Sequence, residues 1–391
     1  MTGTADSTAA SASETVQAAD LLRVLRDRKQ ILVTCHAHPD PDALGSAVGL
    51  TYLLGQALPE AKIEMAIKGG LGGGINAAFT RHARLSLTAW DDERLLDRER
   101  PDAYDAVVLC DVQPAFPHSP LPAGLEKAGV DFPTAIIDHH RARGRKPTAD
   151  FVDIRTDVGA TASIVFRYFQ ELDIEVPGDI AATLLYAVES DLAGAAGEPS
   201  DLDNQALAHL TLVADTKLLY RMRHVALPQH YFVSYANAML NATLFENVLF
   251  THLDRIEFLE KPAIIADFLL RLEGADWAVV TALVGEKEDG RPDRLLISAR
   301  TNVSSLSAGE AMRRTMEELG EGGGHRTKAG GSIRLENGSP TEIDRVRLDL
   351  RRRFLRALKI PEDTRGRKLM TVDCEENGSV RRFSIPGSTR E

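Results

Sequence analysis

The stretch ILVTCHAHPDPDALGSAVGL, residues 31–50, decides the fold. Its apolar, β-branched start at 31–34 predicts a buried strand, and the small and apolar residues that end it predict a helix. Pro39 and Pro41 bias the residues before them toward extended backbone, so that side chains two apart project to one side of the loop. The loop is rich in imidazole and carboxylate groups: it carries His36, His38, Asp40 and Asp42.

Asp40 and Asp42 point to a cation site. They follow a strand, at the place where an open α/β sheet usually carries its functional site. Two carboxylates held this close repel each other, and a bound divalent cation relieves the repulsion. The alternative is a solvated turn in which Asp42 caps the following helix.

Length and composition indicate a two-domain globular protein. The chain has 391 residues, of which 43% are hydrophobic and 26% are charged. No apolar run approaches the roughly 18 residues that a membrane-spanning helix needs. Residues 1–19 are small and polar and contain no arginine, which predicts a disordered leader rather than a secretion signal or transit peptide. We therefore expect a cytoplasmic protein without a membrane partner.

Cysteine usage and charge narrow the function further. Cys35, Cys110 and Cys374 show no CxxC spacing, which disfavours a disulfide framework or a cysteine zinc site. We interpret Cys35 and Cys110, which end apolar runs, as small core residues. The net charge of −11 disfavours long duplex nucleic acid, which binds mainly through phosphate contacts to a positive surface. A short anionic substrate remains compatible.

Alternating strands and helices in the first half predict an α/β fold with a parallel sheet covered on both faces. Two of the strand candidates end in ligand-type residues. Asp111 closes one apolar run, and Asp138, His139 and His140 close another. Such endings suit a metal centre, because each ligand rests on a rigid element. The expected elements are a helix at 18–28, strands at 62–67, 106–111 and 134–140, and helices at 160–172, 179–190 and 200–223, with a further helical region to 241.

The second half predicts a second sheet. Strand patterns occur at 247–253, 277–285 and 294–301, with helices at 262–272 and 308–319 and an amphipathic helix at 342–360 that should cover the sheet. The segment GEGGGHRTKAGGSIRL, 320–335, predicts a glycine turn whose backbone amides could approach an anion, beside the donors of His325, Arg326 and Lys328.

Together the motifs HAHPDPDALGS, LCDV, IIDHH, a later aspartate and GGGHRTKAGG resemble the DHH phosphoesterase family with its DHH-associated C-terminal domain. The likeness covers about residues 21–360. In the size of its domains the chain is most similar to the oligoribonuclease and pAp-phosphatase (nanoRNase) branch of the family. It implies an N-terminal parallel-sheet domain, a smaller α/β domain, and an active site in the cleft between them. The expected segments are a leader at 1–19, the metal-binding domain at 20–225, a helical connection at 226–243, the substrate-binding domain at 244–362 and a tail at 363–391.

The resemblance implies a site with two Mn²⁺ ions, which Mg²⁺ or Co²⁺ could replace. His140 would face the scissile phosphate, Asp138 would orient its neighbours, and His38 occupies a spacer position. The sequence around Asp191 departs from the family pattern, which makes this the weakest assignment. The implied ligands are His36, Asp40 and Asp111 for the first ion and Asp42, Asp111, His139 and Asp191 for the second, with Asp111 bridging.

The resemblance also implies a clamp in the second domain for the far end of the substrate, formed by Arg300, Gly322, Gly323, Gly324, His325 and Lys328. Lys328 departs from the family pattern by adding a cation. The leading hypothesis is hydrolysis of short nucleotides: nanoRNA, pAp, or linear dinucleotides, with cyclic dinucleotides also considered. Alternatives are a nucleotide-binding regulator without turnover and a single-strand DNA exonuclease. A pyrophosphatase should carry a different C-terminal domain without GGGH. A homodimer is expected from the resemblance alone.

Overall fold

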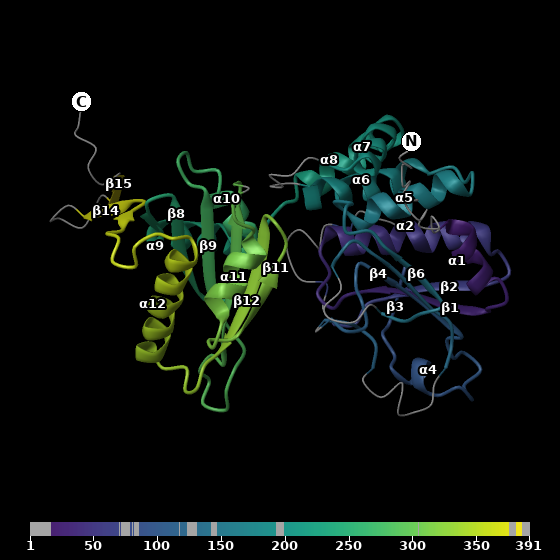
Figure 1. Cartoon of the computed structure of the whole chain (residues 1–391), viewed down its shortest axis with the longest axis horizontal. Coiled ribbons are helices and arrows are strands. Elements are labelled where there is room, and N and C mark those ends of the chain that lie inside the picture. The colour runs from purple at the N-terminus through teal and green to yellow at the C-terminus, as the bar shows by residue number, and fades with distance from the viewer. Residues whose placement is uncertain are drawn as a thin grey trace, which may run out of the picture. The chain divides into compact units, whose positions relative to one another are not determined.

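Two compact units make up the chain in the computed structural model (Figure 1), one built mainly from residues up to Arg223 and the other mainly from His224 onward. Most of the predicted leader lies outside the described residues, and the first helix begins at Ala18. No helix among the residues described is long and apolar enough to cross a membrane. The structure describes residues 17–69, 71, 79, 81, 86–116, 118–122, 131–141, 147–192, 199–303, 305–374 and 381–384.

The first unit contains a six-stranded sheet in which every neighbouring pair is parallel. The strand order is β3-β2-β1-β4-β5-β6, so the strand that begins the quoted stretch lies inside the sheet. The central strands are buried almost throughout, as continuous apolar runs require. The strands are β1 (Gln30–Cys35), β2 (Lys62–Ala66), β3 (Leu87–Thr88), β4 (Ala106–Cys110), β5 (Thr134–Asp138) and β6 (Phe151–Ile154).

Helices of the first unit pack mainly on one face of this sheet, where α1, α2 and α5 contact its strands (Figure 1). Among the described residues, the other face carries the short α4 and connecting segments, whose Leu95 and Tyr104 pack on the strands. The helices are α1 (Ala18–Leu25), α2 (Pro41–Ala57), α4 (Glu93–Leu96), α5 (Thr161–Glu171), α6 (Gly178–Leu192), α7 (Asp201–Val213) and α8 (Thr216–Arg223).

The strands predicted at 31–34, 62–67, 106–111 and 134–140 are confirmed as β1, β2, β4 and β5. Sequence analysis missed β3 and β6, which form the two edges of the sheet. Both are short and only partly buried, so neither produces a continuous apolar run. The prediction for Cys35 and Cys110 is also confirmed: both side chains are buried, and burial raises the pKa of each thiol well above its ordinary value.

The second unit contains a seven-stranded mixed sheet in the order β11-β12-β10-β9-β8-β7-β13. The pair β8 and β9 is parallel and the others are antiparallel. A separate two-stranded hairpin, β14 and β15, follows. The strands are β7 (Thr243–Phe245), β8 (Val248–Arg255), β9 (Trp277–Val284), β10 (Arg294–Thr301), β11 (Glu321–Gly324), β12 (Lys328–Arg334), β13 (Arg367–Lys368), β14 (Thr371–Cys374) and β15 (Arg381–Ser384).

Two hydrophobic clusters hold helices against the second sheet. In one, Ala238 of α9 and Ala266 of α10 pack with strand residues such as Leu249. In the other, Met312 of α11 and Phe354 of α12 pack with the strands, so the predicted helix at 342–360 does cover this sheet. The helices are α9 (Gln229–Asn241), α10 (Lys261–Leu269), α11 (Ala308–Met316) and α12 (Pro340–Ala357).

One expectation for the second unit is wrong in detail. The segment 320–335 is not a glycine turn but a hairpin, in which β11 pairs with β12 over Gly322–Gly324. Glycine is a turn signal in sequence, whereas here the backbone ladder with β12 decides the conformation. In the tail at 363–391, Arg367–Lys368 form β13 of the sheet, and Thr371–Cys374 pair with Arg381–Ser384 as β14 and β15.

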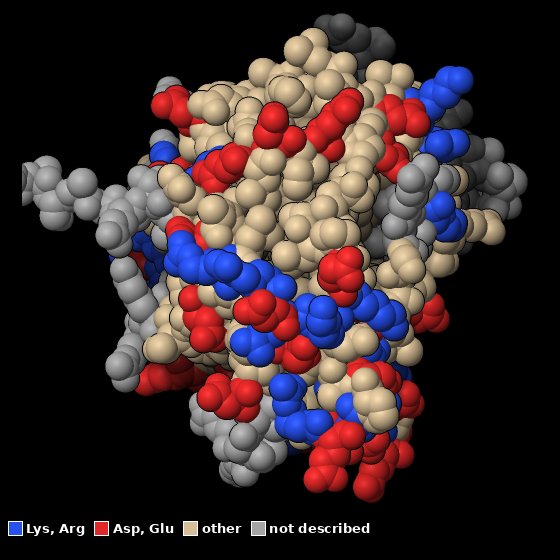
Figure 2. Space-filling model, turned by 90° about the vertical axis from the view of Figure 1, so that its right-hand side faces the viewer, with Lys and Arg blue, Asp and Glu red and all other residues tan. Residues whose placement is uncertain are grey.

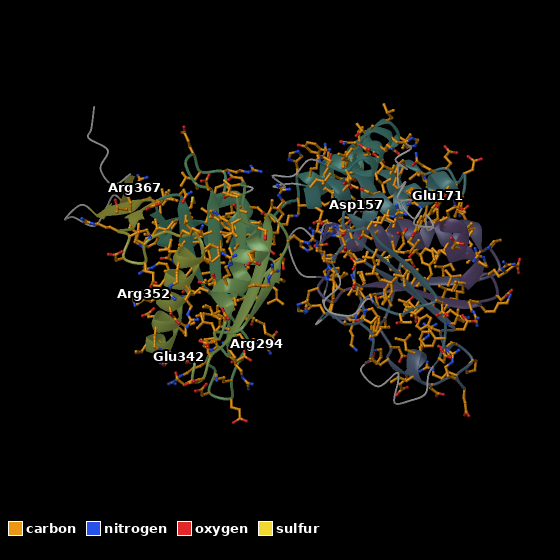
Figure 3. All side chains as sticks on the ribbon, in the orientation of Figure 1. Asp157, Glu171, Arg294, Glu342, Arg352 and Arg367 are labelled. Atoms are coloured by element: carbon orange, nitrogen blue, oxygen red, sulfur yellow. The ribbon has the colours of Figure 1, made fainter. Side chains whose placement is uncertain are left out.

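Glu342, labelled in Figure 3, stabilises the loop that precedes α12. Its carboxylate accepts the backbone N–H groups of Glu336, Asn337 and Gly338 at 2.6 to 2.9 Å, while Ser339 caps the helix. Burial opposes ionisation of Glu342, but these N–H groups hold its pKa below the ordinary value.

Replacing Glu342 with glutamine should lower the free energy of unfolding by about 1–2 kcal/mol at pH 7. Because the pKa is lowered in the folded state, this stabilisation is present above the pKa of an unfolded glutamate, about 4.3, and is lost as the pH falls through the folded value. Urea unfolding of both proteins between pH 7 and pH 3 measures it. The exposed neighbour Glu336, replaced with glutamine, is the control and should change little; an equal effect of both variants would contradict the assignment.

Candidate metal centre

The acidic and imidazole side chains gather at the carboxyl-terminal edge of the first sheet. His36 directly follows β1, Asp111 directly follows β4, and Asp138 is the last residue of β5. Since these three strands are neighbours and parallel, their carboxyl ends meet at one edge. The sheet thus brings together residues that are far apart in the sequence.

Helices α2 and α5 hold Asp42 between them. Its Oδ2 accepts the N–H of Thr161 at 2.8 Å and its Oδ1 accepts the N–H of Ala162 at 3.0 Å, both at the start of α5. The positive end of the α5 dipole favours this carboxylate. Asp40, rather than Asp42, caps α2, because its Oδ1 accepts the N–H of Ala43 at 3.1 Å. The alternative of a solvated turn is therefore wrong for Asp42, which is fully buried.

Three groups of side chains each place ligand atoms within 4.8 Å of one another. In the first group, His36 Nε2 lies 3.9 Å from Asp40 Oδ1 and 3.7 Å from Asp111 Oδ2. Two atoms bound about 2.1 Å from a single cation lie about 3 to 3.5 Å apart, so a small inward shift would suit a cation. The groups are His36, Asp40 and Asp111; Asp42, His139 and Asp191; and Asp111, His139 and His140.

The second group has the same spacing. His139 Nε2 lies 4.0 Å from Asp42 Oδ2 and 3.4 Å from Asp191 Oδ2. Its donor set of imidazole and carboxylate groups suits Mn²⁺, and no thiol takes part. All six side chains predicted as metal ligands fall within the three groups.

Asp111 links the groups through its two carboxylate oxygens. Oδ2 faces His36, whereas Oδ1 lies 3.5 Å from His139 Nε2 and accepts the hydroxyl of Thr161 at 2.8 Å. The backbone of Asp111 has a left-handed φ of 57°, a conformation that non-glycine residues adopt uncommonly. Such backbone strain concentrates at functional sites, and here it accompanies a carboxylate that faces two imidazoles at once.

The electrostatics show how strongly the acids interact. Burial and the nearby carboxylates of Asp111 and Asp191 raise the pKa of Asp42 well above its ordinary value. Burial acts on Asp111 in the same direction, but His140 and the other imidazoles lower its pKa below the usual range. The described residues therefore bring together four carboxylates that repel one another, which is the situation that a divalent cation relieves.

A hydrogen-bonded pair orients His140. Asp138 Oδ1 accepts from His140 Nδ1 at 2.7 Å and from its backbone N–H at 3.1 Å. Gln113 in turn donates to Asp138 Oδ2 at 2.7 Å and to the carbonyl of His140 at 3.0 Å. Burial disfavours the imidazolium, but the carboxylates of Asp111 and Asp138 raise the pKa of His140 to about 12.

Sequence analysis missed two residues of this site, Gln113 and Thr161. Gln113 lies two positions after Asp111, and Thr161 begins α5. Their positions next to a predicted strand end and a predicted helix were the only features of the sequence that could have indicated them. One further placement differs in detail: Asp191 lies inside the last turn of α6 rather than after it. His38, predicted to occupy a spacer position, is exposed, has a left-handed φ of 56° and belongs to none of the three groups.

The residues predicted as a substrate clamp lie in the second unit. Arg300 and Lys328 stand opposite each other in the β10–β12 ladder, and Gly324 pairs with Ala329 on the next strand. His325 is exposed, and its carbonyl accepts the N–H of Gly309 at the start of α11. The structure therefore brings these residues to one end of that sheet. Arg300 also forms an ion pair with Asp267, at 2.6 Å.

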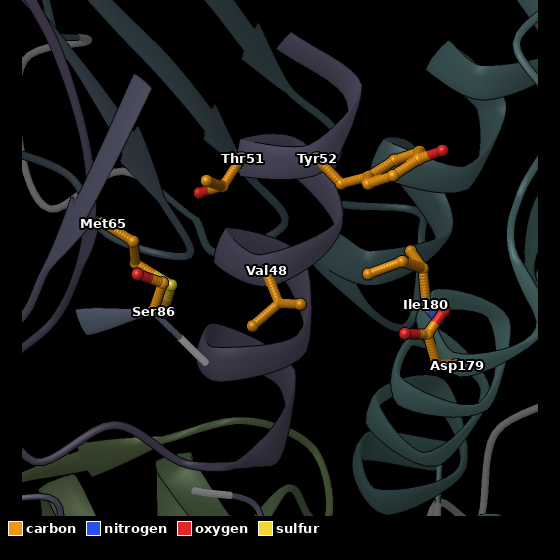
Figure 4. A pocket seen from close by; sticks show the side chains of 7 residues that line it. All are labelled: Val48, Thr51, Tyr52, Met65, Ser86, Asp179 and Ile180. Carbon is orange, nitrogen blue, oxygen red and sulfur yellow. The ribbon is translucent and has the colours of Figure 1, made fainter. Parts of the chain in front are cut away.

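A pocket of about 220 Å³ lies elsewhere in the first unit (Figure 4). Its lining comes from α2, β2 and the start of α6, and it includes Val48, Tyr52, Met65 and Asp179. None of the clustered ligand residues lines it. The metal centre is thus distinct from this mostly apolar pocket.

Two domain families match the chain. Residues 30–188 match the DHH family, N-terminal domain, and residues 251–350 match the DHHA1 domain. The chain therefore carries a DHH domain followed by a DHHA1 domain, in the order that the motifs predict. All the clustered residues except Asp191 fall within the first match.

Two relatives are similar to parts of the chain. An uncharacterized protein of Methanocaldococcus jannaschii, MJ1633, is 31% identical over 306 residues, which cover 78% of this chain and 58% of that protein. A probable manganese-dependent inorganic pyrophosphatase of Streptococcus thermophilus is 30% identical over 163 residues, 41% of this chain and 48% of the relative. The chain thus spans about half the length of these two relatives.

A solved structure shares the fold. The exopolyphosphatase-related protein from Bacteroides fragilis has a TM-score of 0.65 at 15% identity, and the match covers 89% of this chain and 98% of that one. At this identity the likeness supports the architecture of the two domains and not a particular substrate.

Proposed function

We propose that this protein is a metal-dependent phosphoesterase that hydrolyses short nucleotides: nanoRNA, pAp or linear dinucleotides. The observation that carries the proposal is a pair of ligand groups that Asp111 links, since Asp111 belongs to the first group and its Oδ1 lies 3.5 Å from His139 of the second. His36 and Asp40 complete one group, and three residues complete the other: Asp42, His139 and Asp191. The relative named a manganese-dependent pyrophosphatase agrees with Mn²⁺ as the preferred ion.

Two divalent cations held by these residues would lower the pKa of a water molecule and offset charge on the phosphoryl oxygens. The chain's own residues supply the remainder. Asp138 holds His140 by Nδ1 and so fixes the orientation of the imidazole ring that would face a phosphoryl oxygen. Gln113 keeps Asp138 in place, and Thr161 does the same for Asp111.

The second unit supports a short substrate. We propose that Arg300, Lys328 and the Gly322–His325 segment bind a phosphate or nucleotide of the substrate. The charge pattern agrees with a short ligand. On the face shown in Figure 2, Lys and Arg form a band with Asp and Glu interspersed, and further acidic residues lie above and below it. Such a mixed surface offers no continuous track for a long phosphate backbone.

A substrate panel tests the proposal. The purified full chain with Mn²⁺ is incubated with RNA two- to five-mers, pAp, pApA, a cyclic dinucleotide, inorganic pyrophosphate and a 20-mer DNA, and products are separated by chromatography. We expect kcat/KM for the best short nucleotide to exceed that for the 20-mer by about 100-fold or more, and EDTA to abolish activity. Binding without turnover would indicate a regulator, pyrophosphate hydrolysis alone a pyrophosphatase, and efficient cleavage of the 20-mer an exonuclease. Cytoplasmic location and a homodimer stay predictions.

A further inference from the structure

A lysine and a tryptophan lie on the same sheet edge as the metal centre. Lys68 is the second residue after β2, and Trp90 is the second after β3. These strands follow β1 in the parallel sheet, so their carboxyl ends face the same way as the end that carries His36. Neighbouring strands are about 4.8 Å apart, which places the two strand ends about 5 and 10 Å from that of β1.

Asp92 holds the two side chains together. Its carboxylate lies 3.1 and 3.2 Å from Lys68 Nζ, and its Oδ1 accepts the indole N–H of Trp90 at 2.8 Å. The ammonium lies 5.5 Å from the centre of the indole ring. The side chains of Lys68 and Asp92 are 38% and 44% exposed, so an aromatic face and a cation meet at a surface that water reaches.

Two features of the packing relate this group to the metal centre. Gly69, next to Lys68, lies so close to the loop of the metal ligands that a Cβ there would be 3.7 Å from the His38 ring. Trp90 and Phe116 pack against the same hydrophobic cluster, and the edge of Phe116 meets the ring of His140 with a centroid distance of 5.8 Å. Neither relation involves the ligand groups directly, so it is the strand order and this packing that put Lys68 and Trp90 at the sheet edge that carries the metal centre.

We propose that Lys68, Trp90 and Asp92 form a nucleoside subsite beside the metal centre. This deepens the proposed function and rests on it. The indole stacks on the base next to the scissile phosphate, and the base takes the place that the Lys68 ammonium now occupies over the ring. The released ammonium pairs with a neighbouring phosphate, while Asp92 continues to hold the indole N–H.

The subsite distinguishes nucleotides from inorganic phosphates. Every base has a π-face that stacks on an aromatic ring, which accounts for about 10- to 100-fold in affinity, whereas pyrophosphate has none. Trp90 should therefore matter only for substrates with a base. Lys68 should matter for both kinds of substrate, because its partner is a phosphate.

Kinetics of three variants test this. In Trp90→Ala, kcat/KM for pApA should fall about 10- to 100-fold while that for pyrophosphate or tripolyphosphate stays within about 2-fold. Trp90→Phe, which keeps a stacking ring, should recover most of the loss. Lys68→Met should lower kcat/KM for both substrates. An equal loss on both substrates in Trp90→Ala, or no loss on pApA, would overturn the subsite.

Fluorescence provides a readout that needs no turnover. The chain has two tryptophans, and Trp277 is buried in the core of the second unit. Titration with AMP in Mg²⁺ should quench the emission of the wild type and of Trp277→Phe, but not that of Trp90→Phe. Quenching that persists in Trp90→Phe, or is absent from the wild type, would refute stacking. If the wild type hydrolyses nothing but AMP still quenches Trp90, the phosphoesterase proposal fails while the subsite stands.

Discussion

Replacing Asp111 with asparagine is expected to lower kcat/KM for the best phosphate substrate by about 1000-fold or more, equivalent to about 4 kcal/mol in the barrier. The carboxylate presents one oxygen to His36 and the other to His139, so a single change weakens both ligand groups. Asparagine keeps the volume and one oxygen but removes the charge. Steady-state kinetics over a range of Mn²⁺ concentrations measure the loss.

A second measurement separates lost chemistry from lost folding. A cation that binds only the folded state at 100 times its Kd adds about 2.7 kcal/mol of stability. Mn²⁺ should therefore raise the Tm of the wild type and have little effect on Asp111→Asn. The matched control is Glu189→Gln on the last turns of α6, because Glu189 pairs with Arg223 and belongs to none of the ligand groups. Full activity in Asp111→Asn would remove the basis of the phosphoesterase proposal.

Replacing Gly45 with alanine is expected to lower both stability and activity. A Cβ at Gly45 would lie 2.6 Å from the Cβ of Ala187 and 3.2 Å from the carbonyl oxygen of Thr183, so α2 and α6 would have to separate. Overpacking of this kind costs about 1–3 kcal/mol, which outweighs the gain in helix propensity of about 1 kcal/mol. We expect a net loss of up to about 2 kcal/mol in denaturant unfolding.

Activity should fall as well, because α2 and α6 each carry a ligand. Asp42 lies three residues before Gly45, and Asp191 lies one turn after Ala187. A displacement of about 1 Å in a reacting group can cost about 100-fold in rate, so we expect kcat/KM to drop at least 10-fold.

Gly55→Ala is the matched control, on the same helix. Nothing lies within 4 Å of a Cβ at that position, so the change should be neutral or should stabilise by about 0.5–1 kcal/mol. Kinetics should not change. If Gly45→Ala and Gly55→Ala behave alike, the close approach of α2 and α6 does not position Asp42 and Asp191.

The chemistry of the site was accessible from local sequence. Each of the motifs around His36, Asp111 and Asp138 combines an apolar run with ligand-type residues at its end, and a parallel sheet gathers such ends at one edge. Asp191 was harder to assign, because it lies on helix α6 and not at the end of a strand. The sequence does not show where the end of a helix lies relative to the edge of the sheet. Its contact with His139 depends on the packing of α6 against α2 through Gly45.

Other features of the fold had no sequence signal. The glycines of 322–324 predict a turn, yet they form β11, because the backbone of β12 offers hydrogen-bond partners that sequence patterns do not reveal. The edge strands β3 and β6 are too short for a periodic pattern. The roles of Gln113 and Thr161 as hydrogen-bond donors to Asp138 and Asp111 likewise depend on contacts between separate segments.

The sequence by itself determined the α/β class, the central parallel strands and the identity of the acidic and imidazole groups. The spacing of apolar residues and the chemistry of each side chain can both be read from a short stretch of sequence. Only the tertiary structure decided which groups face one another. It placed the two oxygens of Asp111 toward different imidazoles, made Asp42 the cap of α5 rather than α2, and set Trp90 at the sheet edge that carries the metal centre through the strand order. Distances between segments arise from packing, and packing is a property of the whole fold.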